Sequence, residues 1–229
     1  MSDIAENIIQ LKNDLPENVS LVAVSKTKTV EDIMQAYDAG HRLFGENRVQ
    51  ELLDKYEHLP GDIKWHMIGH LQRNKVKYIA GFISMIESVD SARLLRTINK
   101  EAEKSGRVID CLLQFHIALE ETKFGFSLDE VKDMLDEGIL SEMQNVNIRG
   151  VMGMATFTDD MVKVRSEFVK LKSFFDELKN KYFSQKDDFS EISMGMSGDY
   201  PVALDEGSTM VRLGTSIFGA RFCSIDNNK

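Results

Sequence analysis

Short apolar runs alternate with longer segments of helical period along most of the chain, and this alternation limits the possible folds most strongly. The segments between the runs place apolar residues three and four positions apart, as from Val30 to Tyr37 and in Phe168–Leu178, which is typical of amphipathic helices. Alternating strands and helices predict parallel strands joined by crossover helices. The expected strands are Leu21–Lys26, Leu43–Glu46, Ile63–Gly69, Met85–Val89, Val108–Ile117, Asn147–Met154, Glu191–Gly195 and Met210–Gly214.

Eight strand-helix units in 229 residues predict an α/β fold of the closed (β/α)8 type, a TIM barrel. We expect Ile4–Leu15 to form an extra helix before the first strand. The alternative is an open, doubly wound sheet, but no G-x-G-x-x-G motif follows the first expected strand. The chain has three prolines and no Ser/Gly-rich linker. We therefore expect residues 1–229 to form a single barrel domain.

Composition excludes several classes of protein. The net charge is −9, whereas a non-specific nucleic-acid binder needs a basic surface. No apolar run approaches the ~20 residues that cross a bilayer, and the acidic N-terminus lacks the features of a signal peptide. Cys111 and Cys223 form no CxxC pair, which indicates reduced thiols. We expect a cytoplasmic protein that binds neither nucleic acid nor membranes.

A lysine, Lys26, directly follows the apolar run of the first expected strand. Burying an unpaired ammonium group disfavours its charged form, but in a barrel the C-terminal strand ends open into the functional mouth. An amine in a water-poor mouth has a lowered pKa and attacks carbonyls to form a Schiff base. The alternative for Lys26 alone is a surface lysine whose stem covers apolar atoms. Lys28 lies beyond the strand, and we expect it to be solvent-facing or to steer anions.

Glycine and hydroxyl residues follow the last two expected strands, in SMGMSGDYPVAL (193–204) and STMVRLGTSIFGAR (208–221). Glycine lets the backbone approach an anion, and N–H groups at a helix N-terminus bind phosphate. Barrels often hold phosphate at the loops after strands seven and eight. Either loop alone could be an ordinary turn. Both together, next to the strand of Lys26, predict a phosphate-bearing aldehyde, and pyridoxal 5′-phosphate (PLP) is that ligand.

Several segments in one order now point to a family. They are VAVSKTK, LFGENRVQE, WHMIGHLQRNK, ETKFGF, RGVMGM, SMGMSGDY and GSTMVRLGTSIFGAR. Together they resemble the pyridoxal phosphate homeostasis protein family (YggS/PROSC-like), over about Leu21 to Arg221. The resemblance implies a barrel of PLP fold type III, similar to the N-terminal domain of alanine racemase. It also implies a PLP carrier in vitamin B6 and amino-acid homeostasis, with no established catalytic reaction.

The resemblance also assigns residues to the cofactor. Lys26 in VSKT matches the family's Schiff-base lysine. Ser197 in GMS, with Gly214 and Thr215 in RLGT, matches its phosphate cradle, and Arg212 matches the arginine that faces the pyridine nitrogen in the racemase barrel. The segment QFHIALEETKFGF departs from the family's usual asparagine at His116.

Two expectations favour a carrier over a catalyst. An arginine at the ring nitrogen disfavours protonation of the ring, which weakens the ring as an electron sink. The chain stops just after its expected barrel, so we expect no opposing base from a second domain. The first alternative is a weak, PLP-dependent, racemase-like enzyme, and the second is a lysine-dependent aldolase. We expect a monomer, with apo PLP-dependent enzymes as candidate acceptors of the cofactor.

Three further polar residues have competing interpretations. Asn47 follows the second expected strand and neighbours Lys26 in a barrel, so we expect it in the cofactor pocket; the alternative is an N-cap of the next helix. His66 and His70 are four positions apart, a spacing that binds metal on a helix. They flank a strand end and a glycine turn without an evident third ligand, so we expect no metal. The methionines, 12 in number, are expected to fill the barrel.

Overall fold

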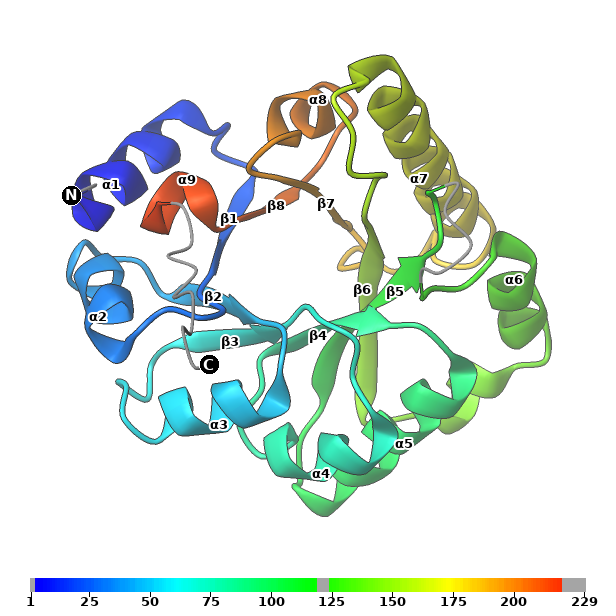
Figure 1. Ribbon diagram of the computed structural model, residues 1–229. Helices are drawn as coiled ribbons and strands as arrows, with labels where there is room; N and C mark the ends of the chain where they lie inside the picture. The colour runs from blue at the N-terminus through cyan, green and yellow to red at the C-terminus, as the bar shows by residue number, and fades with distance from the viewer. Residues whose placement is uncertain (1–2, 119–123, 220–229) are drawn as a thin grey trace, which may run out of the picture.

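Eight parallel strands close into a barrel in which each strand pairs with its neighbours in sequence and β8 pairs with β1 (Figure 1). The computed structural model describes residues 3–118 and 124–219. All eight expected strands are confirmed, most with ends shifted by one or two residues. They are β1 (Ser20–Val24), β2 (Leu43–Glu46), β3 (Lys64–Met67), β4 (Met85–Val89), β5 (Ile109–Phe115), β6 (Val146–Gly153), β7 (Glu191–Met196) and β8 (Met210–Leu213).

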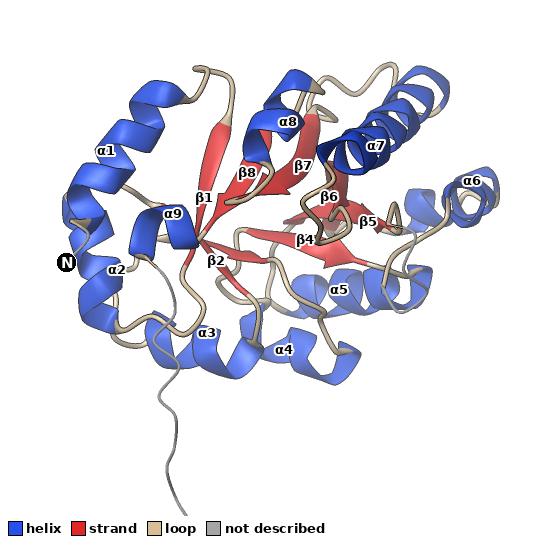
Figure 2. Cartoon of the chain, turned by 45° about the horizontal axis from the view of Figure 1, so that its top comes forward, coloured by secondary structure: helices blue, strands red, loops and turns tan. Residues whose placement is uncertain are grey.

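Helices surround the barrel on its outer side (Figures 1 and 2). They are α1 (Ile4–Asp14), α2 (Val30–Asp38), α3 (Val49–Tyr56), α4 (Val76–Ile79), α5 (Ala92–Lys104), α6 (Leu128–Asp136), α7 (Met161–Lys181), α8 (Tyr200–Asp205) and α9 (Thr215–Phe218), with 3-10 turns at Arg73–Lys75 and Ile139–Glu142. The expected extra helix before the first strand is α1. Within the two described ranges, no helix combines the length and the hydrophobicity that a membrane span requires.

Local sequence signals explain where several helices begin. Thr29 and Asp32 form a capping box at the start of α2, in which each side chain accepts a hydrogen bond from the other residue's backbone N–H. Ser127 and Glu130 form the same arrangement at the start of α6. These capping boxes therefore fix the residues at which α2 and α6 begin.

The barrel interior is built in layers because side chains alternate between the two faces of a strand. A layer of apolar side chains joins five strands and is made of Val22, Met85, Leu112, Met152 and Met210. Met85, Met152 and Met210 therefore fill the barrel as expected, whereas buried Met67 and Met194 belong to the larger apolar cluster that includes the helices. Two positions further along β4 and β8, the same inner face carries Glu87 and Arg212. A buried polar layer therefore lies directly above the apolar one.

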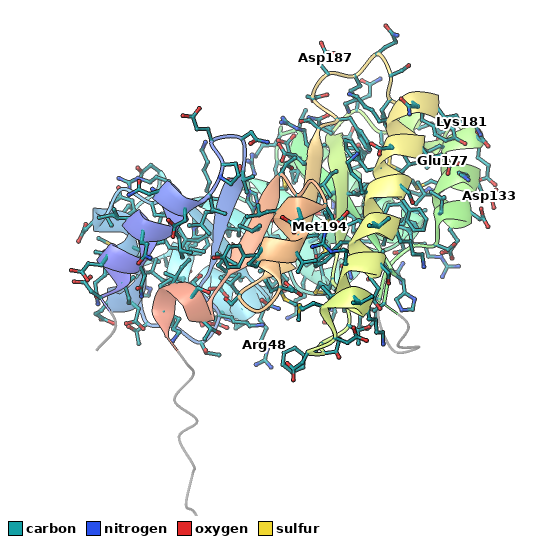
Figure 3. All side chains as sticks on the ribbon, turned by 90° about the horizontal axis from the view of Figure 1, so that it is seen from above. Arg48, Asp133, Glu177, Lys181, Asp187 and Met194 are labelled. Atoms are coloured by element: carbon teal, nitrogen blue, oxygen red, sulfur yellow. The ribbon has the colours of Figure 1, made fainter. Side chains whose placement is uncertain are left out.

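The two ends of the barrel differ in what they carry. Arg48, which follows β2, and Asp187, which precedes β7, lie at opposite ends of the molecule (Figure 3). The end marked by Arg48 is the one where the strands finish, and functional residues of such barrels gather there.

Candidate functional site

A cavity of about 380 Å³ opens at the C-terminal ends of the strands. This volume falls within the roughly 300–1,000 Å³ typical of small-molecule sites. Its lining includes all six residues that the sequence predicts for the cofactor, drawn from β1, β2, β7, β8 and the turns that follow them. They are Lys26, Asn47, Ser197, Arg212, Gly214 and Thr215. The fold therefore brings them together, while their contact with a cofactor stays a prediction.

Lys26 lies in the turn after β1, two residues beyond the strand end. The next residue, Thr27, has a positive φ of 64°, which is an outlier for a β-branched side chain. Lys55 of α3 is buried behind this turn, and its Nζ donates to the carbonyl oxygen of Ser25 at 2.7 Å and to Glu46 Oε1 at 2.6 Å. Burial raises the pKa of Glu46, against the effect of the Lys55 charge. No sequence pattern pointed to Lys55, since only the fold places α3 against this turn.

At the neighbouring strand ends, Ser197 joins the ends of β7 and β8, and β8 pairs with β1, the strand that precedes Lys26. Its Oγ accepts hydrogen bonds from the backbone N–H groups of Gly214 and Ser216, both at 3.3 Å. Gly195, two residues earlier, has a φ of +96° and packs so closely on α8 that a Cβ would lie 2.7 Å from the Cβ of Ala203. Only glycine satisfies both conditions, so the glycine of the GMS segment fixes where Ser197 lies.

Arg212 takes part in the buried polar layer below the cavity. One Nη atom donates to Ser193 Oγ at 2.5 Å, and the other donates to the carbonyl oxygen of Gly153 at 2.9 Å. Ser193 Oγ in turn donates to Glu87 at 2.6 Å, and the Arg212 guanidinium lies 3.8 Å from the same carboxylate. Within the described ranges, Nε of Arg212 donates no hydrogen bond. Both Nη atoms are therefore held by the protein, on a side chain that also lines the cavity.

Glu87 is the centre of this layer and has no exposed surface. Its second carboxylate oxygen lies 2.7 Å from Nδ1 of His66. Burial alone would raise the pKa of Glu87, but the hydrogen bond and charge of His66 and the charge of Arg212 outweigh it, so the pKa lies below its ordinary value. Burial lowers the pKa of Arg212, against the charge of Glu87. Glu87 and Arg212 therefore form a buried ion pair in which each charge stabilises the charged form of the other group.

Asn47 has a buried Oδ1 that accepts no hydrogen bond within residues 3–118 and 124–219. The N-cap of α3 is Arg48 and not Asn47, so the N-cap interpretation of Asn47 is wrong. Buried polar atoms normally have partners. An orphan acceptor in the cavity wall is suited to a donor on a bound ligand.

The structure separates other polar residues from this arrangement. Lys28 lines the cavity, but its Nζ donates to the carbonyl oxygen of Phe218 at 3.1 Å, so it holds α9 and is not simply solvent-facing. His116 is not part of the cavity lining. His66 is buried against Glu87, whereas His70 pairs with Asp90 at the surface. In the described part of the chain, no three His, Cys, Asp or Glu side chains are grouped to hold a metal.

Comparison with known proteins agrees with this geometry. The family model described as "Alanine racemase, N-terminal domain" matches residues 1–222. A pyridoxal phosphate homeostasis protein of Aquifex aeolicus is 41% identical over 202 residues, covering 88% of this chain and 86% of the relative. One from Synechocystis is 40% identical over 209 residues, covering 90% and 94%. This chain belongs to the pyridoxal phosphate homeostasis protein family.

Solved structures extend the comparison. PipY of Synechococcus elongatus, solved with PLP bound, is 37% identical and has a TM-score of 0.86 over 94% of this chain and 100% of PipY. Alanine racemase of Clostridium difficile is 16% identical, with a TM-score of 0.76 over all of this chain and 59% of the racemase. The racemase likeness shows the fold alone, whereas members of the homeostasis family match along nearly their whole length.

Proposed function

We propose that this chain binds PLP in the cavity, holds it through Lys26, and acts as an intracellular PLP carrier or regulator in vitamin B6 and amino-acid homeostasis. The observation that carries the proposal is the convergence on one cavity of Lys26 and the Ser197 loop, from the ends of β1 and β7. The names of the homeostasis-family relatives and the PLP-bound PipY structure support the choice of ligand.

The residues of the cavity fit PLP in their chemistry. Bound PLP supplies an aldehyde that a lysine amine attacks, and a ring that withdraws electrons. The hydroxyl of Ser197 and the backbone N–H of Thr215 would hold the phosphate, and Gly214, whose own N–H donates to Ser197 Oγ, would let the backbone approach closely. Asn47 Oδ1 would accept a hydrogen bond from the cofactor. Arg212 would present Nε to the pyridine ring while its Nη atoms stay bound to the barrel.

We further propose that the protein carries PLP without turning over an amino acid. The Arg212 cation is held next to the cavity by Glu87, Ser193 and Gly153, and a fixed cation disfavours a protonated ring nitrogen. Apo PLP-dependent enzymes are the proposed acceptors, and the cytoplasm the proposed location. A weak racemase-like activity is the competing function, favoured by the alanine racemase domain match.

Borohydride trapping tests the assignment of Lys26. The protein is incubated with PLP, reduced with borohydride, digested and analysed by mass spectrometry. We expect the pyridoxyl label on Lys26. A label found chiefly on Lys28, which lines the same cavity, would refute the assignment.

Two binding and exchange measurements test the remaining parts. Pyridoxal, which lacks the phosphate, should bind at least about tenfold more weakly than PLP, because charge-assisted hydrogen bonds contribute roughly 1.5–3 kcal/mol each; equal affinities would rule out the phosphate cradle. The α-proton of alanine should exchange with deuterated water no faster with the PLP-loaded protein than with free PLP. Much faster exchange would establish the racemase-like function instead.

A further inference from the structure

Both residues that flank Lys26 are tied to a second group of charged side chains. Ser25 Oγ donates to Glu46 Oε1 at 2.6 Å, and the carbonyl oxygen of Ser25 accepts from Lys55 Nζ at 2.7 Å. On the other side, the backbone N–H of Thr27 donates to Glu51 Oε1. Lys26 therefore sits in a turn that is anchored immediately before and immediately after it.

One ammonium group joins the two anchors. Lys55 Nζ lies 2.6 Å from Glu46 Oε1 and 2.7 Å from Glu51 Oε1. Glu46 has no exposed surface and Lys55 is 5% exposed. Desolvating such a cluster costs free energy that its attractions only partly return, so a buried ion pair is weak evidence for a stabilising role. A cluster placed behind one particular turn is better explained by what it does to that turn.

The anchored turn contains a backbone outlier. Thr27, at a φ of 64°, is the single non-glycine residue with positive φ in the described ranges. A β-branched residue persists in this conformation only where its surroundings hold it there. The turn is closed by the backbone N–H of Lys28, which donates to the carbonyl oxygen of Ser25 at 3.0 Å. The hydrogen bond from the Thr27 N–H to Glu51 and that from Lys55 to Ser25 add contacts from α3 on both sides of Lys26.

We propose that Glu46, Glu51 and Lys55 are positioning residues that hold the 25–27 turn in its strained conformation and thereby place the Lys26 amine in the cavity. The inference rests on the proposed function of Lys26. In that function the amine condenses with the aldehyde of PLP and one water leaves, with no oxidant or reductant. Because Ser197 would hold the phosphate independently of this turn, at the ends of β7 and β8, a shifted turn would separate the amine from the aldehyde.

The first test compares Lys55→Met with Lys104→Met, which removes the exposed partner of Glu101 on α5. Two ligands are titrated: PLP, and pyridoxine 5′-phosphate, which has no aldehyde and reads the rest of the cavity. A displacement of about 1 Å lowers the rate of an oriented reaction by up to ~100-fold. We expect Lys55→Met to slow borohydride-trapped labelling of Lys26 by roughly 10–100-fold while pyridoxine 5′-phosphate binds within about twofold of wild type. Lys104→Met should change neither.

The second test uses the strain itself. Glu51→Ala removes the acceptor of the Thr27 N–H, and we expect slower labelling of Lys26. Glycine adopts positive φ without a Cβ penalty, so adding Thr27→Gly to Glu51→Ala should restore labelling toward the wild-type rate. A role of Glu51 in general stability would not be rescued by this change, and Glu51 is partly exposed, so the pair remains informative if Lys55→Met fails to fold.

The outcomes separate the two proposals. Absence of label on Lys26 of the wild-type chain would overturn the proposed function and this inference with it. Normal wild-type labelling with an equal rate in Lys55→Met would overturn the positioning role alone. So would equal losses of affinity for both ligands, or a failure of Thr27→Gly to restore labelling.

Discussion

Removing the charge of Glu87 should destabilise the protein strongly even without any ligand. Glu87 has no exposed surface, and Arg212, 3.8 Å from its carboxylate, is 3% exposed. In Glu87→Gln the side chain keeps its shape, but the guanidinium of Arg212 loses its counter-charge in the barrel interior. Breaking a buried pair by removing one partner costs about 3–5 kcal/mol. For a chain of this size, each kcal/mol corresponds to roughly 2–4 °C in Tm, so we expect a decrease of about 6–20 °C.

Urea and thermal unfolding of the apo protein measure this loss. The matched control is Glu101→Gln, which breaks an exposed pair with Lys104 and should cost less than about 1 kcal/mol. In a double-mutant cycle, Arg212→Met combined with Glu87→Gln should cost less than the two single changes added together, since the second change removes the charge that the first left unpaired. A loss below about 1 kcal/mol for Glu87→Gln, or strict additivity, would refute the coupling inferred from the geometry.

The pH dependence follows from the same group. The folded-state pKa of Glu87 lies below its ordinary value because of His66 and Arg212. The carboxylate therefore contributes stability above the unfolded-state pKa, and this contribution is lost as pH falls through the folded-state pKa. Below the ordinary glutamate pKa of 4.5, the difference in unfolding free energy between wild type and Glu87→Gln should narrow.

Three further changes test other parts of the fold and site. Gly195→Ala should lower the unfolding free energy by about 1–3 kcal/mol, because the added Cβ would lie 2.7 Å from the Cβ of Ala203. The control Gly198→Ala, where an added Cβ meets no atom within 4 Å, should leave stability unchanged. Similar melting curves for the two variants would contradict the close packing. Asn47→Leu removes a buried acceptor that has no hydrogen-bond partner among the described residues. The unfolding free energy of the apo protein should therefore rise by about 1 kcal/mol, while PLP affinity falls about tenfold. Unchanged PLP affinity in a fluorescence titration would show that Asn47 does not contact the cofactor. Desolvation lowers the pKa of buried His41 to about 4, from an ordinary value of 6.5. The unfolded chain therefore binds more protons than the folded one, and the unfolding free energy falls by up to about 3 kcal/mol as pH drops from 6.5 to 4. His41→Gln should flatten this part of the curve of stability against pH.

Periodicity was sufficient to predict the barrel because each unit carries its own signal. All eight strands lie where the apolar runs are, and the expected helix at Ile4–Leu15 is present as Ile4–Asp14. Strand ends were less certain: the first was expected to reach Lys26 but ends at Val24. Glu51 and Lys55 on α3 contact the residues on both sides of Lys26, and no local pattern in the turn reveals those contacts.

The candidate site was predictable in its membership but not in its internal contacts. A barrel places successive strand ends around one mouth, so residues that follow strands share a cavity once the strands are known. The partners of Arg212 were not predictable in this way. Ser193, Glu87 and Gly153 come from three other strands, and which side chains meet across a barrel depends on strand register and on side-chain length.

By itself the sequence determined the (β/α)8 architecture, the family, and the set of residues that surround the mouth, because those properties follow from local patterns repeated along the chain. The tertiary structure alone decided that Lys55 anchors the turn of Lys26, that Glu87 pairs with Arg212, and that Asn47 leaves an acceptor unsatisfied. These contacts join residues from separate strands and helices inside a low-dielectric interior. There the free energy of a charge is set by its neighbours in space and not by its neighbours in sequence.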